Sequence, residues 1–552
     1  MKKFIAVIAA IAVIITSLFG ISAFAEGNIK YPTGISDEMC DSSYWYDKGL
    51  GDTDKLLMTL DEVEAVNQTT FNTPDTNVDD LFNMAEDYNA TALKNEFVNN
   101  IEQPGFDMYI DGVLVDTDEY LKKITSAIDK TGYDGMAKIQ YAVCANQADL
   151  KAYPTDDMIG DSDTDSSDEM QSSRLCVNEP FVIKQKCDID GKTFYWGNSY
   201  NCTGWINGAN LAICKDKAEW MDACKFDINA KDFVVVTQSK VVTEVSRFAP
   251  YCSEVNLPFG TILKLVPEDE IPATIGERGT WNNYVVYLPT RDANGKYVKQ
   301  PALISQHYKL SVGFVPFTQK NLLDVAFNCL GDRYGWSGML KAMDCSLYIR
   351  NIYRCFGFEF PRNTTWQQYI PNTLIDMTAM SDIQKEQLIE TLPIGTPLYF
   401  NGHTMMYTGT QDKTNYAISA TGFIIDSAGE KISQRQYSVI LNPLTVRRSD
   451  GNTWLHHLTS AVVVMPKIDM AECTVTAVED VEGNVKASVS YGSNELYEDV
   501  NFTVEHDKKT ATVSGINFYT GQKTVKIKKP NIFQKICHFF KTVFRKFISL
   551  FK

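Results

Sequence analysis

Residues 330–357 read LGDRYGWSGMLKAMDCSLYIRNIYRCFG, and one cysteine, Cys345, divides most of this stretch into two parts. The part before it is a loop rich in glycine and aromatic residues. In the part after it, apolar residues such as Ile349 and Ile352 recur at helical spacing until Gly357, which can end a helix. Cys345 is therefore predicted to lie at a helix N-terminus, where free backbone N–H groups and the helix dipole favour a thiolate. The alternative is a buried thiol with a purely structural role.

A cysteine nucleophile needs a base, and His403 is the candidate among the six histidines of the chain. It follows Asn401-Gly402, a dipeptide typical of tight hairpin turns, and is therefore predicted to begin a strand. A cysteine on a helix that faces a histidine on a strand is the arrangement of Cys–His peptidases. The next predicted strand, TNYAIS, ends at Ser419, whose hydroxyl is the nearest candidate to accept the Nδ1 proton of His403. The alternatives are an ordinary strand histidine and a serine outside the site.

Several motifs together resemble a known family. RYGWSG, DCS and FPRNTTWQ, all between Leu330 and Gln367, are followed by GHTMMYTG. This set resembles the NlpC-type family of papain-like cell-wall cysteine peptidases, in its multidomain form with bacterial SH3-like modules. The resemblance extends upstream through DLKAYPT, NEPFVI and TGWI, and so covers roughly residues 40–466. Ser419 departs from the histidine, asparagine or glutamine usual there, and GWSG departs from the more frequent GWGG.

The resemblance implies a hydrolase that cuts the amide between γ-D-glutamate and the diamino acid of peptidoglycan stem peptides, with a preference for stems that have a free N-terminal L-alanine. It makes Cys345 the nucleophile and His403 the base, and it assigns Asp344 to the substrate ammonium. Tyr334 would help to bind the substrate and the oxyanion. The remaining pocket residues that it implies are Ser346, Thr364 and Trp336. The alternatives are a helix-capping role for Asp344 and core positions for the two aromatic residues.

The rest of the chain divides into further predicted modules, as expected for 552 residues. Thr59 and Glu62 form a predicted capping box in a mostly helical region, whereas later regions show the short alternating runs of small β-barrels. The predicted fold class is α+β and multidomain, with a papain-like catalytic domain, two SH3-like β-barrels and a C-terminal sandwich-like module. The predicted boundaries are a signal peptide at 1–25, a mixed, mostly helical domain at 28–135, SH3-like domains at 140–228 and 229–318, the peptidase domain at 319–466, a small all-β (Ig-like) module at 470–528 and a basic amphipathic helix at 530–552.

The N-terminal sequence predicts export. Lys2 and Lys3 precede an apolar run from Phe4 to Phe19, and Ala23 and Ala25 fit an A-x-A cleavage site. No later run is long and uncharged enough to predict a membrane-spanning helix. The protein is therefore expected to be secreted and associated with the cell envelope.

Charge and cysteine content restrict the partners. The chain carries 69 acidic and 52 basic residues, which argues against nucleic acid as a partner. Thirteen cysteines without any C-x-x-C spacing give little support to a zinc site, and their pairing cannot be read from the sequence. The acidic segment 156–169 lacks the glycine and the final acid of a calcium loop, so we expect a solvated loop there. No metal and no cofactor are expected.

The tail NIFQKICHFFKTVFRKFISLFK, residues 531–552, is predicted to form a basic amphipathic helix. Its aromatic face and its basic, acid-free polar face are typical of helices that lie on anionic lipid. We expect it to bind an anionic membrane surface or an acidic wall polymer. The alternative is a helix packed against its own protein.

Two functions remain open at this point. The first is a secreted endopeptidase of the cell wall, and the second is a wall-binding or scaffolding protein whose peptidase domain is weak or inactive. Cys345, His403, Asp344 and Tyr334 favour the first, whereas Ser419 favours the second. Acyl or amide transfer by the same Cys–His pair is a further alternative. The sequence leaves open the diamino acid, the oligomeric state, and whether intact wall or shed fragments are the substrate.

Overall fold

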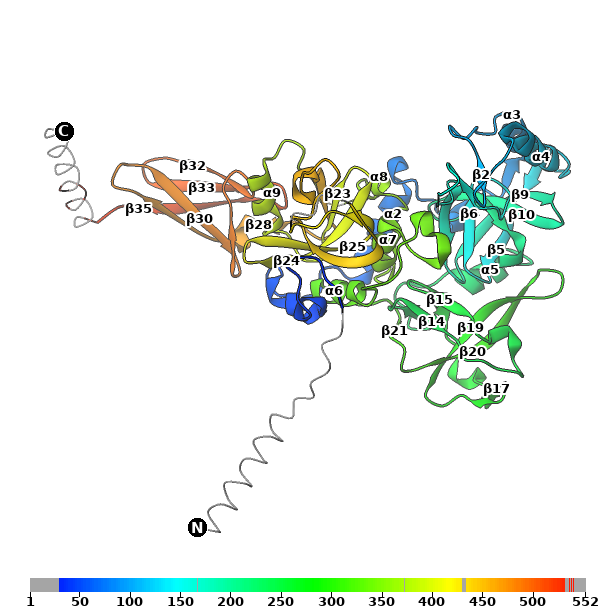
Figure 1. Ribbon diagram of the computed structural model, residues 1–552. Coiled ribbons are helices and arrows are strands. Elements are labelled where there is room, and N and C mark those ends of the chain that lie inside the picture. The colour runs from blue at the N-terminus through cyan, green and yellow to red at the C-terminus, as the bar shows by residue number, and fades with distance from the viewer. Residues whose placement is uncertain are drawn as a thin grey trace, which may run out of the picture.

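The structure, a computed structural model, places several modules in an elongated arrangement (Figure 1). Two β-rich modules lie at one end, an α+β module lies in the middle, and a narrow β module lies at the other end. None of the described helices is long and apolar enough to cross a membrane. The predicted signal peptide falls outside the described residues and stays a prediction. The structure describes residues 29–165, 167–371, 373–428 and 433–531 together with the single residues 536, 538 and 540.

The first described segment packs on the central α+β module. It contains the 3₁₀ helices η1 (Glu38–Cys40) and η2 (Ser42–Lys48). Trp45 is fully buried, with its ring 5.1 Å from that of Tyr416. Further along, the Leu50 N–H donates to Oε1 of Gln319 at 3.0 Å. These residues therefore form one wall of the core of a module that is far away in sequence.

The remaining helices of the predicted N-terminal region pack against more than one module. The capping box of Thr59 and Glu62 at the start of α2 is confirmed: Thr59 N–H donates to Glu62 Oε2 at 2.7 Å, and Glu62 N–H donates to Thr59 Oγ1 at 3.3 Å. Phe97 on α3 contacts Trp196 and Trp205 of the first β module. Residues 28–135 thus contribute to more than one hydrophobic core. Elements of this region are α2 (Leu60–Phe71), η3 (Pro74–Thr76), η4 (Leu81–Asn83), β1 (Asp87–Asn89), α3 (Ala90–Asn99), β2 (Tyr109–Ile110), β3 (Val113–Leu114), α4 (Thr117–Asp129) and β4 (Met136–Lys138).

The first β module is built on a seven-stranded sheet whose pairs are all antiparallel. The strand order is β12-β5-β9-β10-β11-β6-β8, and the register of β9 against β10 shifts between Trp196 and Gly197. The module lies within the span predicted to be β-rich. Its elements are β5 (Gln140–Cys144), β6 (Ala148–Lys151), β7 (Ile159–Gly160), β8 (Gln171–Leu175), β9 (Pro180–Ile189), β10 (Lys192–Asn198), β11 (Thr203–Asn207), η5 (Gly208–Asn210), β12 (Leu211–Ile213) and α5 (Lys217–Cys224).

The second β module has its own apolar core, formed by valines, leucines and isoleucines such as Val234, Val286 and Leu303. It consists of a three-stranded sheet, β16-β13-β21, and three strand pairs. Its elements are β13 (Phe233–Val236), β14 (Lys240–Val242), η6 (Pro250–Cys252), β15 (Asn256–Pro258), β16 (Ile262–Lys264), η7 (Glu268–Glu270), β17 (Thr274–Ile275), β18 (Arg278–Gly279), β19 (Asn283–Arg291), β20 (Tyr297–Ser305) and β21 (Leu310–Val312).

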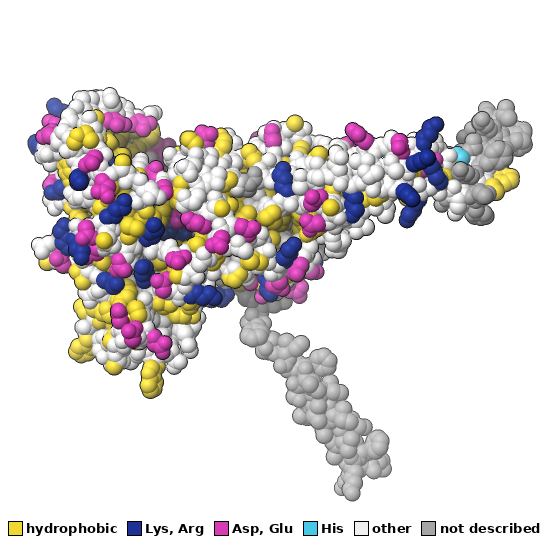
Figure 2. Space-filling model, turned by 180° about the vertical axis from the view of Figure 1, so that it is seen from behind, with side chains coloured by type: hydrophobic (Ala, Val, Ile, Leu, Met, Phe, Trp, Pro, Cys, Tyr) yellow, Lys and Arg dark blue, Asp and Glu magenta, His cyan; other side chains and the backbone are white. Residues whose placement is uncertain are grey.

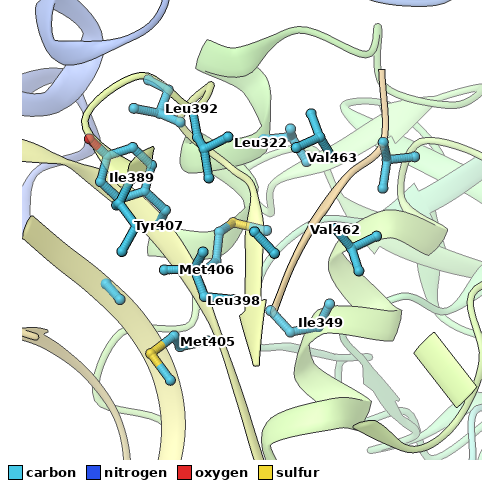
Figure 3. Close-up of a cluster of buried hydrophobic side chains, with 14 of the residues drawn as sticks. Leu322, Ile349, Ile389, Leu392, Leu398, Met405, Met406, Tyr407, Val462 and Val463 are labelled. Atoms are coloured by element: carbon cyan, nitrogen blue, oxygen red, sulfur yellow. The ribbon is translucent and has the colours of Figure 1, made fainter. Parts of the chain in front are cut away.

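The central module combines a six-stranded antiparallel sheet, in the order β22-β27-β23-β24-β25-β26, with helices that pack against it. Figure 3 shows Leu322 and Ile349 from two of these helices among buried side chains of the sheet, including Leu398, Met406 and Val462. Its elements are α6 (Gln319–Phe327), η8 (Trp336–Lys341), α7 (Cys345–Arg354), α8 (Thr364–Gln367), β22 (Thr373–Asp376), α9 (Asp382–Ile389), β23 (Pro397–Phe400), β24 (His403–Gln411), β25 (Thr414–Ile424), β26 (Gln434–Pro443), α10 (Trp454–His457) and β27 (Ser460–Val463).

The C-terminal module is a six-stranded sheet in the order β31-β30-β29-β35-β33-β32, with β29 and β35 parallel. Asn501 Nδ2 and the Tyr519 hydroxyl donate to Oγ1 and O of Thr391, which attaches the module to the central one. Figure 2 shows basic side chains gathered toward its far end. The predicted tail helix lies largely outside the described residues. Elements of this region are β28 (Ile468–Asp469), η9 (Met470–Glu472), β29 (Thr474–Glu479), β30 (Val485–Tyr491), β31 (Asn494–Leu496), β32 (Phe502–His506), β33 (Thr510–Gly515), β34 (Tyr519–Thr520) and β35 (Gln522–Lys528).

Candidate active site

Cys345 is the first residue of α7, as the sequence predicted. Asp344 caps the helix, because its Oδ1 accepts the N–H of Leu347 at 2.8 Å. The backbone N–H groups of Thr404 and Ser346 lie against the Cys345 thiol and lower its pKa. Since Thr404 follows His403 directly, this contact places the thiol beside the start of β24. Helix α7 also packs against β24. The two elements predicted to carry the cysteine and the histidine are therefore in contact.

The acidity of the Cys345 thiol differs from the expectation. Burial raises its pKa to about 12, and the neighbouring Asp344 carboxylate raises it further. These two effects on the pKa are larger than the lowering by the N–H groups of Thr404 and Ser346 and by the Arg362 guanidinium. The raised pKa means that Cys345 is held as a neutral thiol at neutral pH.

His403 opens β24 after a tight turn, again as predicted. Residues Asn401 and Gly402 form the turn, with Gly402 at a φ of 81° that a glycine adopts without strain. The imidazole packs against Phe400 and Trp454, with ring centroids at 5.2 and 4.9 Å. Burial lowers the pKa of His403 well below its ordinary value, and the Arg448 guanidinium lowers it further. His403 is thus held as a neutral imidazole, the form that can accept a proton.

Ser419 lies on β25 next to His403 and is fully buried. Its Oγ is 3.3 Å from Nε2 of His403. The sequence argument expected the contact through Nδ1, but the structure makes it through the other ring nitrogen. Nδ1 of His403 forms no hydrogen bond with the described residues.

An arginine that the sequence argument did not select is joined to the candidate site. Arg362 binds both oxygens of Asp344, with Nη2 2.7 Å from Oδ2 and Nη1 3.1 Å from Oδ1. Nη1 also donates to Ser346 Oγ at 3.0 Å, and Nε donates to Ser173 Oγ of the first β module at 2.8 Å. All four side chains are buried. The motif FPRNTTWQ contains Arg362, but nothing in its spacing from Asp344 identifies the pair.

The remaining predicted pocket residues occupy different places. Tyr334 and Trp336 line a cavity of about 480 Å³ together with His403. Ser346 is buried in the network around Asp344 and is not among the residues that line this cavity. Thr364 begins α8, which is tied to the nucleophile helix because Gln367 Nε2 donates to the Ser346 carbonyl at 2.9 Å. The cavity therefore brings together Tyr334, Trp336 and His403, whereas Ser346 and Thr364 do not line it.

Farther along α7, a second buried charge cluster connects it to the first β module. Glu179 Oε1 accepts from Arg350 Nη2 at 2.5 Å and lies 3.4 Å from Arg354 Nη1, and all three side chains are buried. Glu179 Oε2 accepts the N–H of Cys176 at 2.8 Å. Burial raises the pKa of Glu179, but the two guanidinium groups and this N–H lower it more, so the carboxylate stays charged. The orientation of helix α7 is thus fixed by a residue of another module.

In the described part of the chain, no group of three or more histidine, cysteine, aspartate or glutamate side chains is placed to hold a metal ion. The twelve described cysteines are all unpaired thiols. The site offers a thiol, an imidazole, a hydroxyl and a buried ion pair, which is the chemistry of nucleophilic acyl transfer.

Cys345 at the start of α7 thus lies against the beginning of β24, the strand that carries His403. Residues 331–463 match the model of the NlpC/P60 family, so this part of the chain is an NlpC/P60 domain. Members of this family are cysteine peptidases, and the family indicates an enzyme of the cell wall.

The comparison with solved structures found other NlpC/P60 proteins. An NlpC/P60 endopeptidase from Photobacterium damselae subsp. piscicida has a TM-score of 0.57 and 16% identity, with 79% of this chain and 98% of that chain covered. An NlpC/P60 family protein from Bacillus cereus ATCC 10987 has a TM-score of 0.38 and 15% identity, with 59% and 100% covered. No curated protein matches the chain. The first of these likenesses shows that the fold extends well beyond the family domain.

Proposed function

We propose that this protein is an exported cell-wall endopeptidase that hydrolyses the amide between γ-D-glutamate and the diamino acid of peptidoglycan stem peptides. The observation that carries the proposal is the placement of Cys345 at the start of α7, against the backbone N–H that follows His403. The NlpC/P60 domain and the described fold of the Photobacterium damselae endopeptidase support it. The two β-rich modules are proposed to be SH3-like and to hold the stem peptide or the wall.

The proposed reaction uses one proton carrier twice. His403 takes the proton of the Cys345 thiol as the sulfur attacks the γ-carbonyl carbon of D-glutamate, and a tetrahedral oxyanion forms. His403 then gives this proton to the departing amine of the diamino acid, and the C–N bond breaks to leave a thioester. Water, deprotonated by His403, hydrolyses the thioester and restores the thiol. Ser419 holds the imidazole at Nε2, and the Tyr334 hydroxyl is proposed to help bind the oxyanion.

The preference for a free N-terminal L-alanine is part of the same proposal. Oδ1 of Asp344 accepts from three groups, whereas Oδ2 accepts only from Arg362 among the described residues. A carboxylate oxygen accepts more than one hydrogen bond, so Oδ2 is the oxygen of Asp344 that can accept a further bond from an ammonium group. Acetylating the L-alanine of a stem peptide should therefore lower kcat/KM of the wild type by about tenfold or more. Equal turnover of free and acetylated stems would contradict this role of Asp344.

The nucleophile is tested with L-Ala-γ-D-Glu-diaminopimelate as substrate and release of the dipeptide as the measurement. Cys345→Ala and His403→Ala should each lower kcat by at least about ten-thousandfold. Cys40→Ala is the matched control, because Cys40 is only partly buried and lies outside the site. Comparable urea midpoints of all variants would show that they are folded. Wild-type turnover by Cys345→Ala would overturn the peptidase, and an inactive wild type that binds wall material would support the scaffolding alternative.

Tethering by residues 531–552 stays a proposal from the sequence. The test is co-sedimentation with anionic vesicles in low salt, where the mature protein should pellet and a variant ending at residue 528 should not. If both proteins behave alike, the tail does not tether the enzyme to lipid.

A further inference from the structure

The cavity beside His403 has an unusual charge. Its lining contains two charged residues, Arg447 and Arg448, and no aspartate or glutamate from the described part of the chain. The other lining groups are aromatic, apolar or neutral polar side chains and backbone. The chain as a whole carries a net charge of −17. An acid-free cavity with two arginines in an acidic protein indicates that part of the ligand is anionic.

Arg448 is held in position without an ion pair to a described residue. Its guanidinium carbon lies 4.8 Å from the centre of the Phe400 ring, and Nη1 donates to the Asn401 carbonyl at 3.4 Å. Stacking on an aromatic ring keeps a guanidinium planar face covered and leaves its edge free to bind. Neither Arg447 nor Arg448 forms an ion pair with any described residue.

The nearest acid in sequence is engaged elsewhere. Asp450 lies two residues beyond Arg448, but its carboxylate pairs with Nε2 of His457 and accepts the N–H of Asn452. These contacts lower the pKa of Asp450 to about 2, so it remains charged and bonded to them. The turn therefore presents Arg448 to the cavity, while the carboxylate of Asp450 is directed to His457.

The position of Arg448 relative to His403 indicates which part of the substrate Arg448 contacts. In amide cleavage by a Cys–His pair, the histidine must reach the departing amine to protonate it. The residue that leaves therefore lies on the histidine side of the nucleophile. Phe400 is shared by both groups, since its ring contacts His403 and also carries Arg448. A side chain of the leaving residue that passes His403 reaches the edge of the guanidinium.

We propose that Arg448, assisted by Arg447, forms a subsite for a free carboxylate on the side chain of the leaving diamino acid. This inference rests on the proposed function and adds the substrate class to it: stems whose diamino acid ends in an ionised carboxylate, as in diaminopimelate. A lysine side chain brings only an ammonium group to two unpaired guanidinium groups. An amidated diaminopimelate keeps the size but loses the charge, so it cannot form the bidentate ion pair that arginine favours.

The test uses three matched stems, L-Ala-γ-D-Glu followed by diaminopimelate, by amidated diaminopimelate or by lysine. The wild type should cleave the free-carboxylate stem about ten- to hundredfold better, in kcat/KM, than either of the others. In Arg448→Gln this ratio should fall toward one, and Arg448→Lys should retain part of it because the charge remains without the planar fork. Arg247→Gln is the matched control, because Arg247 is an exposed arginine of the second β module that lines none of the cavities described here.

The outcomes separate this inference from the function on which it rests. If the wild type cleaves all three stems equally, or if Arg448→Gln keeps the full preference, the subsite is overturned and the endopeptidase stands. If the wild type cleaves none of the stems, the proposed function falls and the subsite falls with it. A loss of the preference in both Arg448→Gln and Arg247→Gln would also overturn the subsite, because the effect would then not depend on the position of Arg448.

Discussion

Helix α7 carries buried charges at two places. One is beside the Cys345 thiol at the start of the helix, and the other is farther along it. At its N-terminus Asp344 pairs with Arg362, next to the reactive thiol. One to three turns farther on, Arg350 and Arg354 pair with Glu179 of the first β module. Both clusters are buried, so neither is a solvated surface pair of small effect. Helix α7 therefore connects the candidate active site of the central module to the packing of the first β module.

The largest expected effect comes from the cluster that joins the modules. Glu179→Ala would leave two buried guanidinium groups without their shared carboxylate, and we expect the free energy of unfolding to fall by about 3–5 kcal/mol. Urea unfolding measures this loss, with the exposed Glu244→Ala as control. A change below about 1 kcal/mol would mean that water or other groups satisfy the arginines, and it would remove the distinction between the two clusters.

The Asp344–Arg362 pair should affect activity as well as stability. Arg362→Gln leaves the Asp344 carboxylate with two hydrogen bonds but without its cation, which we expect to cost about 2–3 kcal/mol of stability. Because Asp344 precedes the nucleophile directly, kcat should fall by about tenfold or more. Arg362→Lys keeps the charge and should recover part of the stability but less of kcat. If kcat stays unchanged while stability falls, this pair is structural only, like the Glu179 cluster.

The pH dependence of kcat/KM tests the protonation states of His403 and Cys345. Burial lowers the pKa of His403, so the imidazole stays neutral well below the ordinary value of about 6.5. Its protonation, and with it the loss of kcat/KM, should therefore come at lower pH, and activity should persist at about pH 5.5. The thiol pKa of about 12 predicts slow alkylation of Cys345 by iodoacetamide at neutral pH. A kcat/KM profile that falls at pH 6.5 would show that the pKa of His403 is not lowered, and rapid alkylation of Cys345 would show a preformed thiolate.

The smallest expected effect belongs to Ser419. Its hydrogen bond to His403 is 3.3 Å long and lies between groups already fixed by packing. Ser419→Ala should lower kcat/KM by less than about tenfold, equivalent to roughly 1 kcal/mol. Ser419→Val removes the hydroxyl and also adds volume, so a larger loss of kcat/KM than in Ser419→Ala would report a steric effect. A hundredfold loss in the alanine variant would instead make Ser419 a full orienting partner of the base.

The sequence predicted the features of the site that depend on local patterns. Cys345 begins a helix because a capping acid precedes an apolar periodic run, and His403 begins a strand because Asn401 and Gly402 make the turn. The capping box at Thr59 follows from the same kind of rule. These signals need only a few neighbouring residues, and the motifs around them were enough to suggest the family.

The features that the sequence did not predict are set by distant residues. Glu179 precedes Arg350 by 171 positions, and no periodicity relates them. The thiol pKa was expected to fall at a helix N-terminus, but burial by the surrounding sheet and the adjacent Asp344 reverse the direction. Likewise, residues 28–135 have helical patterns that say nothing of which core each helix joins. Burial and ion pairing of this kind require the assembled modules.

The packing of Trp45 and Leu50 on the central module has a consequence for the order in which the protein can fold. A ribosome makes these residues long before their partners: Gln319 follows Leu50 by 269 positions. At a synthesis rate of about 5–20 residues per second, Gln319 is made roughly 15–50 seconds after Leu50. Until then Trp45 and the apolar residues near it stay exposed and prone to wrong contacts. We infer that closure of the central core is a late step of folding, slowed by the length of chain that must first be synthesised and looped.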